Sequence, residues 1–162
     1  MAIVDIHGHL NSPPELMAFK SGLLSSRIHR GRGSLKLSDE RLRPIVDNHV
    51  KKLDEVGTDI QFLSPRPFQL MHSDPLFSIV EDFCKANNDA IKQSVDYYPD
   101  RYRGVCGLPQ VWGQPVNVVF EEMERCVKEL GFVGIMIDPD PSEGLDPHMP
   151  PMGDEYWYPL YE

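Results

Sequence analysis

The stretch MAIVDIHGHL, residues 1–10, decides how the rest of the chain is read. Residues 2–6 form a short apolar run, which predicts a buried strand. Polar sequence rich in Gly and Pro follows at once, so this strand delivers its last side chains into a loop. Because strand side chains alternate, His7 and His9 point the same way, with Cα atoms about 6.6 Å apart.

Beyond this strand, apolar segments alternate with amphipathic ones. We expect helices at 38–56, 74–98 and 115–130 and strands at 58–63, 103–108 and 132–137. Gly57 ends the first helix, and Asp74 with Pro75 opens the second as N-cap and first helical residue. The third helix should turn these residues inward: Val116, Val119, Phe120, Met123, Val127 and Leu130.

Two further segments stand outside this alternation. A helical start at 15–24 gives way to an Arg- and Gly-rich stretch, which we interpret as a long functional or mobile insertion. The aromatic segment at 156–162 is typical of the opening of another helix.

The β-α-β-α-β-α-β order indicates a parallel sheet covered by helices, either a closed barrel or an open doubly wound sheet. No G-x-G-x-x-G follows the first strand, which disfavours the dinucleotide-binding form. A complete (β/α)8 TIM barrel needs about 250 residues. We therefore expect residues 1–162 to be the N-terminal portion of one α/β barrel domain, truncated after about four strands.

Composition limits the partners and the compartment. The formal net charge of −9 opposes general binding to nucleic acid or to anionic membranes. No apolar run is long enough to span a bilayer, and no signal peptide precedes the first strand, so we expect a cytoplasmic protein. The widely spaced Cys84, Cys106 and Cys126 should be reduced core residues.

Two imidazoles at the end of the first strand can converge on one metal ion. Neutral imidazole suits Zn²⁺ and other borderline divalent ions, and Asp5 can support the site from deeper in the barrel. The plain alternative is that H-x-H occurs by chance and binds nothing. The position of His7 and His9 after a strand that opens the chain favours the metal reading.

The segment Val4-Asp5-Ile6-His7-Gly8-His9-Leu10 resembles the D-x-H-x-H signature of the amidohydrolase superfamily, in which both histidines bind the catalytic metal. Further segments match in the family's order: 63–68, 107–110, 138–141 and 153–162. Together they resemble the 4-oxalomesaconate hydratase family, in the branch that contains 2-amino-3-carboxymuconate-6-semialdehyde decarboxylase.

This resemblance implies an amidohydrolase-superfamily lyase. It would hydrate the C=C bond of 4-oxalomesaconate, or of a similar unsaturated oxo-carboxylic acid, during degradation of aromatic compounds. The cofactor would be Zn or another divalent ion such as Mn, held by His7 and His9. The remaining ligands, together with the general acid or base, would come from strands beyond Glu162, so the fragment alone should be inactive. We expect a homo-oligomer.

A small anionic carboxylic acid needs a local cluster of cationic or polar groups in so acidic a chain. Arg66, with Ser64 beside it, follows the second strand and can clamp a carboxylate, although a surface arginine between two turn prolines explains the same residues. Arg30 and Arg32 can form a second anion pocket, or simply a solvated basic loop. His72 is a further candidate for substrate binding.

Three alternatives stay open at this point. Asp138, after the fourth strand, can hydrogen-bond substrate or a ligand histidine, but a Pro-stiffened turn explains it equally. A decarboxylase or hydrolase of the same superfamily fits the same scaffold. A non-catalytic binding module is the third.

Overall fold

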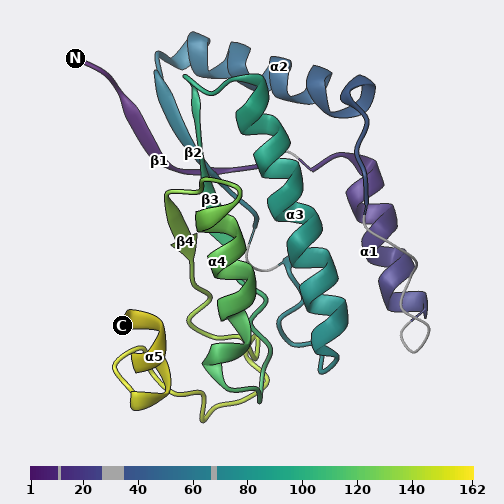
Figure 1. Ribbon diagram of the computed structural model, residues 1–162, viewed down its shortest axis with the longest axis vertical. Helices are drawn as coiled ribbons and strands as arrows, with labels where there is room; N and C mark the ends of the chain where they lie inside the picture. The colour runs from purple at the N-terminus through teal and green to yellow at the C-terminus, as the bar shows by residue number, and fades with distance from the viewer. Residues whose placement is uncertain (11, 27–34, 67–68) are drawn as a thin grey trace.

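A computed structural model describes residues 1–10, 12–26, 35–66 and 69–162. Within them, four parallel strands form one sheet in the order β1-β2-β3-β4 (Figure 1). The strands are β1 Val4–His9, β2 Ile60–Ser64, β3 Tyr102–Gly107 and β4 Gly134–Met136. All four run the same way, so their carboxyl ends meet at one edge of the sheet.

Helices connect the strands as the alternation predicts. They are α1 Pro14–Ser26, α2 Asp39–Val56, α3 Phe77–Tyr97, the 3-10 turn Val116–Val119 leading into α4 Phe120–Lys128, and the 3-10 turn Glu155–Trp157 leading into α5 Tyr158–Tyr161. Gly57 ends α2 in the left-handed region at φ 75°, as expected. None of the helices in the described part of the chain has the length and apolarity needed to cross a membrane.

The predicted start of α3 was wrong. The Asp74 carboxylate accepts a hydrogen bond from the Leu76 backbone N–H at 3.0 Å, which makes a turn before the helix. The N-cap of α3 is therefore Leu76, and Pro75 lies outside the helix.

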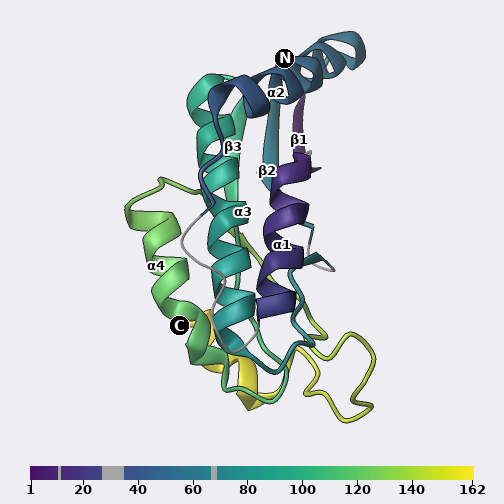
Figure 2. The same cartoon turned by 90° about the vertical axis from the view of Figure 1, so that its right-hand side faces the viewer.

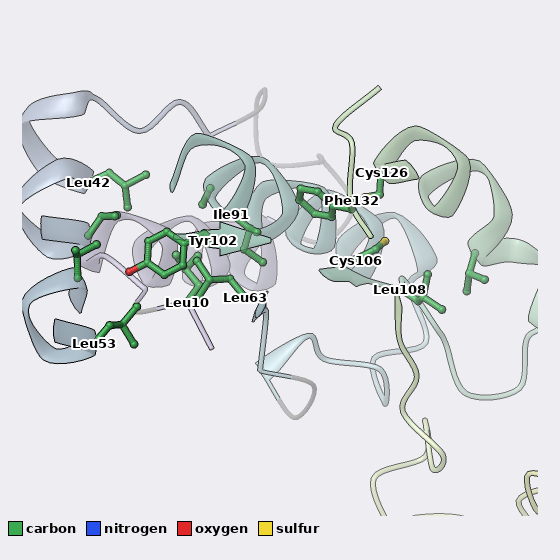
Figure 3. Packing of buried hydrophobic residues seen from close by; sticks show 14 residues of the cluster. Leu10, Leu42, Leu53, Leu63, Ile91, Tyr102, Cys106, Leu108, Cys126 and Phe132 are labelled. Carbon is green, nitrogen blue, oxygen red and sulfur yellow. The ribbon is translucent and has the colours of Figure 1, made fainter. Parts of the chain in front are cut away.

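Helices α2, α3 and α4 pack against one face of the sheet (Figure 2). From the strands, Leu63, Tyr102 and Cys106 enter this core, where they meet Leu42 of α2 and Ile91 of α3 (Figure 3). Strand residues of the opposite face are less covered. The three cysteines are free and buried, as predicted.

One close approach requires a glycine in β3. A Cβ on Gly104 would lie 2.3 Å from the Phe132 ring, so only hydrogen leaves room for that ring on the strand. Phe132 is 5% exposed and precedes β4, which begins two residues later than we expected.

The apolar residues predicted to face inward around α4 do so except for Val127: Val116 and Val119 are buried, and Phe120, Met123 and Leu130 pack against the core. Val127 is 49% exposed, whereas Glu122 is 1% exposed. The Glu122 carboxylate accepts hydrogen bonds from Arg125 Nε at 2.7 Å and from Asn88 Nδ2 at 2.7 Å. These bonds compensate the cost of burying its carboxylate, which the periodicity of apolar residues does not reveal.

Candidate metal and substrate site

The end of β1 brings His7 and His9 together. Their ring centroids are 4.9 Å apart and their planes meet at 79°, edge to face. His7 is exposed and His9 is half-buried. Two imidazoles this close at the carboxyl edge of a parallel sheet can share one ion, as the spacing predicts.

The pairing of β1 with β2 is irregular between Asp5 and Gly8, where His7 lies. Asp5 pairs with Gln61 and Gly8 with Leu63, so three steps in β1 match two in β2. The Asp5 carboxylate accepts bonds from the His7 backbone N–H at 3.1 Å and from Gln61 Nε2 at 2.6 Å. The bond from Gln61, and then that from His7, lowers the pKa of Asp5. Asp5 thus supports His7 through the main chain.

Gln61 lies directly over Gly8 in the neighbouring strand. A Cβ on Gly8 would be 2.3 Å from Gln61 Cδ, so the glycine between the two histidines is needed for this packing. Sequence reasoning did not select Gln61. The available signal was a polar residue inside the otherwise apolar strand IQFL at 60–63, because a buried polar residue needs a partner.

Ser64, the last residue of β2, lies opposite His9. Its Oγ is 3.0 Å from His9 Nδ1 and donates to the Gly8 carbonyl oxygen at 3.2 Å. Partial burial lowers the pKa of His9, the electrostatic effects of His7 and Arg66 lower it further, and backbone hydrogen bonds with Pro65 and Ser64 only partly oppose this. These effects favour the neutral imidazole, which is the form that binds a metal ion.

Arg66 follows β2 and has an exposed side chain. Its charge acts on His9, which places a cation at the same edge of the sheet as the histidines. Among the described residues its guanidinium has no carboxylate partner. Arg30 and Arg32 lie outside the described residues.

His72 joins three loops at this edge. Its Nδ1 is 2.8 Å from Asp138 Oδ2, and its Nε2 is 3.0 Å from the Leu108 carbonyl oxygen. Gln110 extends the connection, since its amide bonds both the backbone N–H and the carbonyl of Asp138 at 2.8 Å. His72 is 1% exposed. Both ring nitrogens therefore face protein acceptors, and no side of the ring is open to a ligand.

Comparison with known proteins agrees with this architecture. Residues 4–162 match the family described as Amidohydrolase. The chain belongs to the amidohydrolase family.

Particular members of that family are similar over the whole chain. A 2-keto-4-carboxy-3-hexenedioate hydratase of Sphingobium sp. strain SYK-6 is 33% identical over 100% of the chain and 48% of its own length. The crystal structure of 4-oxalomesaconate hydratase from Rhodopseudomonas palustris superposes with a TM-score of 0.86 at 32% identity, covering 98% of the chain and 48% of that structure. The chain thus spans about half the length of these hydratases and forms a half-barrel.

A decarboxylase is more distantly similar. The dihydroxybenzoic acid decarboxylase of Polaromonas sp. JS666, solved with manganese and the inhibitor 2-nitroresorcinol, has a TM-score of 0.57 at 25% identity. The match covers 85% of the chain and 38% of that structure.

Proposed function

We propose that the full-length protein is a metal-dependent lyase that adds water to the C=C bond of 4-oxalomesaconate or a similar unsaturated oxo-carboxylic acid. The observation that carries this proposal is the pair of imidazoles, 4.9 Å apart, beside Arg66 at the carboxyl edge of the sheet. The reaction is taken from the hydratases that the chain matches over its whole length.

The residues present fit a divalent metal ion. His7 and His9 are close, His9 favours its neutral form, and Ser64 contacts its Nδ1, which leaves Nε2 for coordination. We propose Zn²⁺, with Mn²⁺ as the alternative because the similar decarboxylase was solved with manganese. A bound ion would supply Lewis acidity toward water or a substrate oxygen.

Two histidines are too few for a catalytic site, which has at least three protein ligands. Within the described ranges, no group of three or more His, Cys, Asp or Glu side chains is placed to hold a metal ion. We therefore propose that residues 1–162 are the N-terminal half of one barrel domain, and that the second half brings the other ligands and the acid or base.

The substrate carboxylates would be held by Arg66, whose planar guanidinium can bind a carboxylate through two hydrogen bonds. Arg30 and Arg32 remain predicted contributors. Because Ser64 is 2% and His72 1% exposed, we propose that these two act on neighbouring protein groups rather than on the substrate.

The location and assembly are also proposals. A cytoplasmic homo-oligomer acting on a small anionic acid, without nucleic acid or membrane partners, suits the net charge of −9. Ile3, just before β1, is 54% exposed and Ile6 on β1 is 74% exposed, so these side chains need a cover from the rest of the barrel or from another subunit.

The test is metal content and product analysis of the full-length protein. Wild type should hold stoichiometric metal and convert 4-oxalomesaconate to a product heavier by one water. His7→Ala/His9→Ala should lose both properties, whereas His148→Ala, which removes an exposed histidine, should retain both.

Each alternative has its own outcome. Metal with release of CO2 from a dihydroxybenzoate, and no hydration, would favour the decarboxylase, since one fold hosts both reactions. A full-length protein without bound metal or turnover would favour a non-catalytic binding module.

A further inference from the structure

Ser64 contacts three consecutive residues, Gly8 and His9 at the end of β1 and Leu10 directly after it. Its backbone carbonyl accepts from the Leu10 N–H at 3.0 Å, and its hydroxyl donates to the Gly8 carbonyl oxygen at 3.2 Å. Between these two, its Oγ lies 3.0 Å from His9 Nδ1. The His9 ring is therefore held by a strand residue rather than by a loop.

The number of hydrogens on the Ser64 hydroxyl indicates which atom donates in its contact with His9 Nδ1. A serine hydroxyl has one hydrogen to donate and two lone pairs. A carbonyl oxygen only accepts, so the Ser64 hydrogen is used on Gly8. With that hydrogen on Gly8, the contact to His9 is donated by Nδ1–H, and a neutral ring with hydrogen on Nδ1 carries its lone pair on Nε2.

We propose that Ser64 is a positioning residue that fixes His9 as the Nδ1–H tautomer and so makes Nε2 the metal-binding nitrogen. This inference rests on the metal-dependent function proposed above. Burial supports it, because at 2% exposure the Ser64 hydroxyl has no competing water contact to turn toward. The partner of a ligand histidine commonly sets its tautomer and ring orientation in this way.

The first experiment measures Zn²⁺ affinity of the full-length protein by competition with a chromophoric chelator. Ser64→Ala should weaken binding roughly tenfold to a hundredfold, the usual effect of losing such a partner. Ser64→Thr keeps the hydroxyl and should recover most of the affinity. Equal affinities for wild type and Ser64→Ala would overturn the proposal.

A second measurement does not depend on metal or on folding of the variants. Nitrogen NMR of metal-free wild type should show His9 with hydrogen on Nδ1 alone, and a ring with hydrogen on Nε2 would overturn the proposal. If wild type shows the Nδ1–H ring but binds no Zn²⁺, the proposed function fails while the role of Ser64 in selecting the tautomer stands.

Discussion

His72 Nδ1 lies 2.8 Å from Asp138 Oδ2, although 66 residues separate the two in sequence. The Asp138 carboxylate only accepts, and so does the Leu108 carbonyl near Nε2. Each ring nitrogen of His72 thus lies within hydrogen-bonding distance of an acceptor from a different loop. The loops after β2, β3 and β4 are therefore joined through one buried imidazole.

Removing the carboxylate should be costly. Asp138→Ala leaves a buried nitrogen of His72 without its hydrogen-bond partner, which should cost about 1–3 kcal/mol of unfolding free energy. Urea unfolding of the full-length protein checks this. The control is Lys52→Ala, which breaks the exposed Lys52–Glu55 pair and should cost less than about 1 kcal/mol. Equal losses of unfolding free energy in the two variants would show that the His72–Asp138 pair stabilises the fold no more than an exposed pair does.

The same pair predicts how stability depends on pH. Burial raises the pKa of Asp138, but hydrogen bonds from His72 and the Asp140 backbone outweigh it and leave the pKa below its ordinary value. A lowered folded-state pKa contributes stability above the unfolded value of about 3.9, and this is lost as pH falls through the folded value. The Tm advantage of wild type over Asp138→Asn should therefore shrink below about pH 4. A constant advantage at every pH would contradict this.

Gly8→Ala should disturb the β1 bulge. The added Cβ would lie 2.3 Å from Gln61 Cδ and push the amide away from Asp5. We expect a loss of about 1–3 kcal/mol in unfolding free energy, with weaker Zn²⁺ binding because His7 and His9 flank this position. In Gly8→Ala/Gln61→Ala the clash is absent, so the double variant should cost less than the sum of the single ones. Simple additivity would argue against direct contact.

Arg66→Ala should weaken substrate binding. Loss of a charged hydrogen bond of about 1.5–3 kcal/mol corresponds to a rise in KM of roughly tenfold or more. Arg66→Lys keeps the charge without the planar fork, so its KM should be intermediate. Steady-state kinetics of the proposed hydration checks this, with metal content measured in parallel. An unchanged KM would leave Arg66 as a surface residue.

The sequence by itself determined the order of the elements and the position of the two histidines. These depend on local patterns: apolar runs for strands, a spaced stripe for helices, Gly57 as a helix stop, and the two-residue period that aligns His7 with His9. Such patterns depend only on residues that are close in sequence, so they can be recognised without knowing how the chain packs.

Only the tertiary structure decided how the site is held. Asp5 meets Gln61 across 56 residues, His9 meets Ser64 across 55 and His72 meets Asp138 across 66. Glu122 is likewise buried because Asn88, on another helix, reaches it. Each hydrogen bond pairs side chains that become neighbours only when strands, helices and loops have packed together. No local periodicity encodes that packing, so these roles followed from the folded structure alone.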